Sequence, residues 1–139
     1  MIPVVFINCR RYPFLRKIVK LSKLYETRTR NMLGRFLGER VMLCETGTGM
    51  NLVRCSAVIS EIIAVRSQWE WIHYYREQSC IVPGSDYDWQ PGTKVKWLYK
   101  LTDVRPVSIP FTPPEDVRHG RTWMELHPEK IGVDLSKIV

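Results

Sequence analysis

The segment from 23 to 30 alternates bulky and charged residues, and it holds the side chains best suited to chemistry. This alternation has the two-residue period of a β-strand and predicts a strand over 24–30. In a strand, Glu26, Arg28 and Arg30 share one face. The other face carries Tyr25, Thr27 and Thr29. We therefore expect these three side chains to point away from any ligand that the charged face binds.

The chemistry open to the charged face is that of one carboxylate among several cations. Glu26 can accept hydrogen bonds from a ring N–H or an exocyclic amine, and Arg28 can hold a phosphate or a carbonyl with two N–H groups. Lys23, at the entry to the strand, becomes a candidate base or nucleophile if nearby cations lower its pKa. The cations that could do so are Arg16, Lys20 and Arg30. The alternative is a solvated Lys23–Glu26 ion pair, which contributes little to stability.

The spacing Lys-x-x-Glu-x-Arg, filled by Lys23, Glu26 and Arg28, resembles the signature of the ASCH family, a relative of the PUA domain. Later segments resemble the remaining strands of the family in the same order, at 39–46, 51–59, 97–106 and 117–123. The resemblance covers residues 1–126, which we assign to one ASCH/PUA-like domain. Residues 127–139 form a C-terminal extension. We expect it to dock on the domain through Ile131, Val133, Leu135 and Ile138.

This resemblance implies a PUA-like barrel whose cleft lies between the motif strand and the helix before it. It also implies two kinds of activity, because the family includes ribonucleases and enzymes that remove an acyl group from a modified cytidine. The deacylating branch has the motif Lys-x-x-Thr-x-Arg. Glu26 replaces that threonine, which removes a hydroxyl group and argues against deacylation. For ribonuclease chemistry, Lys23 with Ser56 or His119 could supply acid–base groups if the fold brings them together.

The pattern along the chain predicts an α+β fold: a small, mostly antiparallel PUA-like β-barrel with two or more flanking helices. Strands are expected at 3–8, 24–30, 39–46, 52–63 and 121–126, with a strand pair at 94–105 and a hairpin turn at Gly47-Thr48-Gly49. Helices are expected at 13–21, with Leu21 on the buried side, and at 67–78, capped by Ser67 and Glu70. Loop 79–93 is of a kind that covers a cleft. The prolines at 106, 110, 113 and 114 predict another extended loop.

The charge of the chain is positive and uneven. The formal net charge is +7 and the pI is about 9.4. The first forty residues hold ten arginines and lysines but only two glutamates, and these cations surround the motif strand. A local positive field of this kind attracts phosphates. We therefore expect RNA or a nucleoside or nucleotide as the ligand, and the sequence leaves the oligomeric state open.

Cysteine and histidine spacing favours neither a metal site nor a disulfide framework. Cys9, Cys44, Cys55 and Cys80 lack metal-ligand spacing, so we expect no bound metal and no cofactor. The apolar start of the chain predicts a first strand and not a signal peptide, and no apolar run is long enough to span a membrane. The simplest interpretation is a cytoplasmic protein with no membrane partner.

Two further groups of residues are candidates for the site. Arg121 and His119, in the closing segment, could contribute to ligand or RNA binding. A hydrolase would need a second carboxylate, for which the candidates are Glu45, Asp86 and Asp88. Of these, Glu45 is the best placed, because it ends a strand beside the hairpin turn.

Three functions remain open at this point. The first is binding of RNA or a modified nucleoside in a basic cleft lined by Lys23, Glu26 and Arg28, with Arg30 and Arg121 in support. The second is hydrolysis of RNA or of an N-acylated nucleoside, with Lys23 and Glu26 as the candidate catalytic residues. The third is a protein-interaction module whose basic face binds an acidic partner.

Overall fold

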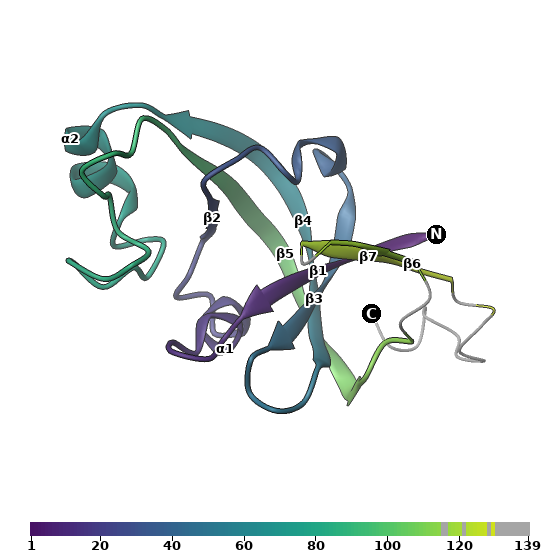
Figure 1. The fold of residues 1–139 in the computed structure, drawn as a ribbon. Coiled ribbons are helices and arrows are strands. Elements are labelled where there is room, and N and C mark those ends of the chain that lie inside the picture. Colours follow the sequence, from purple (N-terminus) through teal and green to yellow (C-terminus); the bar gives the residue numbers. More distant parts are fainter. Residues whose placement is uncertain (115–116, 121, 128, 130–139) are drawn as a thin grey trace.

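The computed structural model describes residues 1–114, 117–120, 122–127 and 129. The strands in these residues form one seven-stranded sheet in the order β2-β5-β4-β3-β1-β7-β6. Their bounds are β1 Ile2–Asn8, β2 Tyr25–Arg28, β3 Arg40–Thr46, β4 Leu52–Val65, β5 Lys96–Phe111, β6 Val117–His119 and β7 Trp123–Leu126. The helical elements are α1 Phe14–Val19, α2 Gln68–Glu70, a 3-10 turn at Gly34–Phe36 and a π-helical turn at Trp71–Tyr75. Figure 1 shows α2 at one end of the long, curved β4–β5 pair.

The predicted α+β class and mostly antiparallel sheet are confirmed, since only the β1–β3 pair is parallel among the pairs formed by the described strands. The predicted β-barrel is not closed in the described part of the chain. β2 and β6 end the strand order, and no pairing in the described part of the chain joins them. Where β2 faces β1, an Arg28 Nη2 donates to the Phe6 carbonyl at 2.7 Å. A side chain thus crosses the gap in place of a backbone ladder.

The β4–β5 pair is longer than the sequence predicts. The expected proline loop from 106 onward is wrong, because β5 continues to Phe111 and Pro106 lies opposite Cys55. The register between β4 and β5 shifts at three places, one of them between Val53 and Cys55. Such irregularities accept residues that cannot donate a backbone hydrogen bond, and they bend the strands.

Helix α1 is shorter than expected and ends in a tight reversal. Leu21, expected on the buried side, is 62% exposed and has a φ of 62°. The Ser22 N–H donates to the Lys17 carbonyl at 2.9 Å and the Leu21 N–H to the Ile18 carbonyl at 2.9 Å, which is the hydrogen-bond pattern of a Schellman motif. The Lys23 N–H also donates to the Lys17 carbonyl, at 3.1 Å. These hydrogen bonds at the helix end therefore fix the position of Lys23, two residues before β2 begins.

The helix expected at 67–78 has the predicted cap but a different interior. The Ser67 hydroxyl accepts a hydrogen bond from the Glu70 N–H at 3.3 Å, which confirms the N-terminal cap. Trp69 of α2 is exposed, and after α2 the chain widens into the π-helical turn, which packs Trp71 into the core and leaves Tyr74 exposed. Wide turns of this kind occur mostly as single turns.

Strand β1 is buried on both faces. It contributes Val5 and Ile7 to one apolar cluster and Val4 and Phe6 to another. The expected docking of residues 127–139 lies outside the described residues, apart from His127 and Glu129. No helix in the described ranges is long and apolar enough to cross a membrane.

Candidate functional site

A pocket of about 480 Å³ lies between β1 and the segment around β2, where the sheet does not close. One wall is the end of β1, from Phe6 to Asn8, and the opposite wall is formed by Lys23 and residues 26–29. Phe14 of α1, Ile81 and Tyr87 of the 79–93 loop, and Thr46 and Asn51 of the β3–β4 hairpin complete the lining. The motif strand and Phe14 of the preceding helix both contribute to this pocket, and the expected basic cleft stays a prediction.

Lys23 is almost completely buried, with 2% of its surface exposed. Its ammonium group donates to the Ser79 carbonyl at 2.5 Å and lies 4.7 Å from the centre of the Phe14 ring. Burial lowers the pKa of Lys23 below its usual range, and the nearby Glu26 charge only partly offsets this effect. Desolvation destabilises the charged form of a lysine, so the neutral amine is easier to reach here than at the surface.

Glu26 and Arg28 form an incompletely satisfied pair in the pocket wall. Glu26 Oε1 lies 3.5 Å from Arg28 Nε, and both side chains are largely buried. Glu26 Oε2 and Arg28 Nε have no hydrogen-bond partner among the described residues. An unsatisfied buried carboxylate oxygen or guanidinium N–H costs free energy. The wall thus contains one acceptor and one donor in neighbouring side chains, and both atoms are closed off from solvent as these side chains stand.

The backbone of β2 explains why Thr27 and Thr29 also line the pocket. The Leu101 N–H donates to the Leu24 carbonyl at 2.9 Å, which makes these two residues a hydrogen-bonded pair. Since such pairs alternate in an antiparallel ladder, Glu26 directs its backbone groups at β5, and Thr27 directs its own toward the open edge. Both threonines therefore line the pocket, while the expected direction of their side chains stays a prediction.

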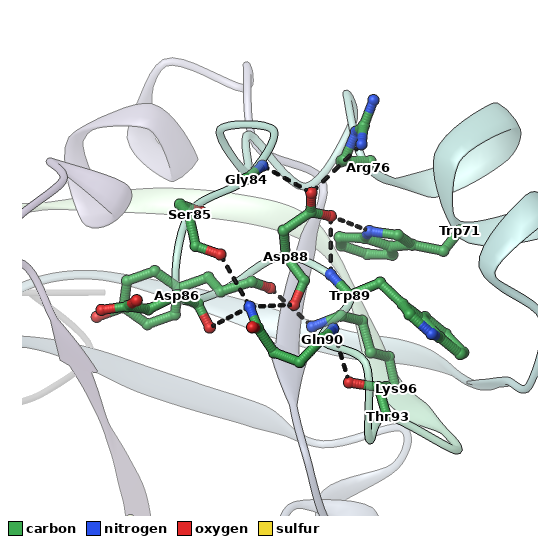
Figure 2. A network of polar contacts seen from close by, with 11 residues as sticks. Trp71, Arg76, Gly84, Ser85, Asp86, Asp88, Trp89, Gln90, Thr93 and Lys96 are labelled. Carbon is green, nitrogen blue, oxygen red and sulfur yellow. Dashed lines mark hydrogen bonds and ion pairs between the residues drawn. The ribbon is translucent and has the colours of Figure 1, made fainter.

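The wall contributed by the 79–93 loop is held by a polar network around Asp88, shown in Figure 2. Asp88 Oδ1 accepts from Trp71 Nε1 at 2.7 Å and from the Trp89 N–H at 2.8 Å. Its Oδ2 accepts from the Gly84 N–H at 2.9 Å and from Arg76 at 3.3 Å. Burial alone raises the pKa of Asp88, but these hydrogen bonds and the Arg76 charge outweigh it and hold the pKa below its usual range. Asp88 is thus a buried structural group and not the exposed catalytic acid that the sequence allowed.

The other candidate residues lie elsewhere. Arg30 is exposed and outside the pocket lining. Glu45 is buried and paired with Arg54 at 2.9 Å, while Asp86 forms an exposed ion pair with Arg11. Tyr25 packs edge-on against Tyr75, with ring centres 5.7 Å apart, as the strand alternation predicts.

The closing segment is described only in part. β6 pairs with β7 so that His119 lies opposite Trp123, and the structure describes the backbone but not the side chain of His119. Arg121 lies outside the described residues. Their expected roles in ligand binding remain predictions.

Sequence reasoning missed several lining residues, among them Asn8, Thr46, Asn51 and Tyr87. Asn8 and Thr46 are paired at the ends of the parallel strands β1 and β3. A polar residue that ends a buried apolar strand is a usable signal, because parallel strands end at the same sheet edge. Tyr87 carries no comparable signal, since only tertiary contacts bring its loop to β2. Within the described ranges, no group of His, Cys, Asp and Glu side chains could hold a metal ion.

Comparison with known proteins supports the fold. No family model matches the sequence, and no curated protein matches it. Among solved structures, the chain is similar to the ASCH protein of Zymomonas mobilis, with a TM-score of 0.72 and 20% identity over 94% of this chain and 90% of that chain. A serine-to-alanine variant of that protein gives a TM-score of 0.73 at 20% identity, covering 99% and 96% of the two chains. A tyrosine-to-phenylalanine variant gives 0.73 at 21% identity, covering 99% and 98%.

These neighbours define the class of fold. The described chain has the fold of ASCH-domain proteins, and the predicted ASCH resemblance is confirmed at this level.

Proposed function

We propose that the protein binds RNA or a nucleoside in the pocket between β1 and β2. The observation that carries this proposal is the unsatisfied pair in the pocket wall, Glu26 Oε2 and Arg28 Nε. A ligand that satisfies both must present a donor next to an acceptor. The edge of a nucleobase does so, with an N–H or amine beside a carbonyl or ring nitrogen.

The remaining properties of the pocket support the same class of ligand. Its volume falls within the range of about 300–1,000 Å³ that is usual for small-molecule sites. The side chains of Asn8, Thr46 and Asn51 add neutral polar groups suited to sugar hydroxyls. Lys23 and Arg28 add positive charge to a lining that already includes an aromatic ring from Phe14.

Calorimetric titration with cytidine, uridine, adenosine, guanosine and a short single-stranded RNA tests the proposal. Glu26→Gln keeps the size of the side chain but places an amide donor beside Arg28, and we expect about 10- to 100-fold weaker binding, since a hydrogen bond to a charged group is worth about 1.5–3 kcal/mol. The matched control is Glu39→Gln, at an exposed glutamate outside the pocket lining. Equal affinity of wild type and Glu26→Gln for every ligand would refute the proposal.

Salt dependence separates RNA from a free nucleoside. RNA bound through its phosphates loses affinity steeply as salt rises, whereas a neutral nucleoside in the pocket does not. A steep dependence for RNA that persists in Glu26→Gln would place RNA binding outside this pocket. If no nucleoside and no RNA binds, the interaction with an acidic protein partner is the surviving alternative, and that binding would be insensitive to nuclease.

A second candidate function is hydrolysis of RNA or of an N-acylated nucleoside. It is favoured by one observation: burial lowers the pKa of Lys23, which lies in the pocket with Glu26. An amine whose pKa is lowered releases its proton more easily and can then act as a base or nucleophile. Lys23→Met should then abolish product formation from RNA and N-acetylcytidine, measured by liquid chromatography, while nucleoside binding persists. Turnover at the wild-type rate would remove Lys23 from the mechanism.

A further inference from the structure

We infer that Tyr87 is the wall on which the planar part of the ligand stacks, and that Asp88 is the residue that positions it. This inference rests on the proposed function and adds a specificity-determining residue to the same pocket. It concerns the 79–93 loop, which the sequence motif does not include.

The ring contacts of Tyr87 leave it suited to stacking. Tyr87 lines the pocket, and its ring meets Phe14 at 5.3 Å and 87° and Tyr12 at 5.9 Å and 75°. Both contacts are edge-type, so neither ring lies parallel to the Tyr87 face. Phe14 already has the Lys23 ammonium over its ring, at 4.7 Å.

Two perpendicular rings form a corner that fits a planar ligand. A heteroaromatic ring can lie parallel on Tyr87 while it meets Phe14 edge-on, and both arrangements are favoured between aromatic groups. In the same pocket, the edge of that ring would meet Glu26 and Arg28. Stacking is tolerant of base identity, whereas the polar edge selects the hydrogen-bond pattern.

Side-chain hydrogen bonds hold the loop backbone before and after Tyr87, and Figure 2 shows this network around Asp88. The Lys96 ammonium donates to the Tyr87 carbonyl at 2.7 Å. The next residue, Asp88, accepts its four hydrogen bonds from the indole of Trp71, from Arg76 and from two backbone N–H groups. The Gln90 amide donates to the carbonyls of Ser85, Asp86 and Asp88.

A loop held in this way presents a preformed wall and does not need to order when the ligand binds. Preorganisation reduces the entropic cost of association, so loss of the Asp88 clamp should weaken binding even though Asp88 does not line the pocket. This separates the two roles: Tyr87 contacts the ligand, and Asp88 acts through Tyr87.

Calorimetric titration with adenosine and cytidine tests the role of Tyr87. We expect Tyr87→Leu to bind adenosine about 10-fold more weakly than wild type, because stacking of one base is worth about 1–3 kcal/mol, or about 5- to 150-fold. Tyr87→Phe restores the ring and should bind at least about fivefold more tightly than Tyr87→Leu. Tyr74→Leu is the matched control, since Tyr74 is exposed and lies outside the pocket lining.

A double-mutant cycle tests the role of Asp88. Asp88→Asn should weaken adenosine binding in the wild-type background but cause no further loss in the Tyr87→Leu background, since both changes remove the same contact. A purely structural role would lower stability without this non-additivity. If the Asp88→Asn variant does not fold, Lys96→Met takes its place in the cycle, because this change removes the hydrogen bond from Lys96 to the Tyr87 carbonyl.

The outcomes distinguish this inference from the proposed function. If nucleosides bind wild type and Tyr87→Leu equally well, Tyr87 is not the stacking wall, and the proposed function stands. If the losses from Tyr87→Leu and Asp88→Asn add, Asp88 does not act through Tyr87. If neither adenosine nor cytidine binds wild type, the nucleoside-binding function and the stacking role both fail.

Discussion

Glu26 and Asp88 are two carboxylates with the same exposure and opposite surroundings. Each is 9% exposed. Each carboxylate oxygen of Asp88 accepts two hydrogen bonds, whereas Glu26 Oε2 accepts none from the described residues. A buried charge is stable in a folded chain when all its hydrogen-bonding atoms have partners. A buried carboxylate oxygen without a partner lowers the free energy of unfolding, and folding alone does not explain why the chain keeps it.

The difference separates a structural group from a binding group in one small protein. The chain stabilises the Asp88 carboxylate with donors from Trp71, Arg76 and two backbone N–H groups, which all come from residues 71–89. Glu26 instead has a neighbour, Arg28, whose Nε is also unsatisfied. Since the two unsatisfied groups are complementary and belong to residues that line a pocket, a ligand that shifts either side chain on entering can supply the missing partners.

The largest effect expected from this comparison is on stability. Asp88→Asn replaces one of the two carboxylate oxygens by an NH2 group that faces two of the four donors and removes the negative charge, and we expect it to lower the free energy of unfolding by about 2–4 kcal/mol. Glu26→Gln removes no hydrogen bond that the described residues make but loses the charge that pairs with Arg28 at 3.5 Å, so its cost should be smaller, about 1–2 kcal/mol. Urea denaturation at pH 7 measures both. Equal losses in the two variants would break the distinction between them.

Those features of the site that depend on neighbouring residues in the chain could be predicted from the sequence. Lys23, Glu26 and Arg28 were found from strand alternation and motif spacing, and the cap at Ser67 from residue type alone. These features depend on neighbours within a few residues, where steric and hydrogen-bonding preferences act directly. Leu21 shows the limit even there, because its left-handed backbone follows from the tight reversal after α1 and not from any preference of leucine.

The sequence could not supply the parts that depend on tertiary contacts. The register of β4 and β5 shifts at three places, and where such irregularities fall depends on how the two strands pair. The residues around Asp88 have the composition of an exposed turn. The side chain is buried because its loop packs on Trp71. The wall formed by Tyr87 arises in the same way, from contacts with Tyr12 and Phe14 about seventy residues earlier.

A smaller effect is expected from acid. The folded-state pKa of Asp88 lies below the usual value of about 3.9, so its stabilising contribution is fully present above that pH and is lost as the pH falls through the folded-state pKa. The stability difference between wild type and Asp88→Asn should therefore shrink between pH 6 and pH 2.5. Urea denaturation at both pH values measures it. A difference that stays constant would mean that the charge of Asp88 does not stabilise the fold.

The smallest effect is expected from Lys23 at alkaline pH, and its sign is opposite to that of Asp88. Burial lowers the folded-state pKa of Lys23, so between that pKa and the usual value near 10.4 the unfolded chain binds more protons than the folded one. Stability then rises with pH across this window, in contrast to a lysine that gains a salt bridge. Lys96 shifts in the same direction, so the effect must be isolated as the difference between wild type and Lys23→Met.

We expect that difference to move in favour of wild type as the pH rises from 7 to 10, measured by urea denaturation. Lys20→Met is the control, because Lys20 is exposed and its substitution should leave the pH profile unchanged. If wild type and Lys23→Met change in parallel, Lys23 is charged in the folded protein throughout this range. The pocket would then carry a permanent cation beside Glu26, which favours anion binding over the chemistry of a neutral amine.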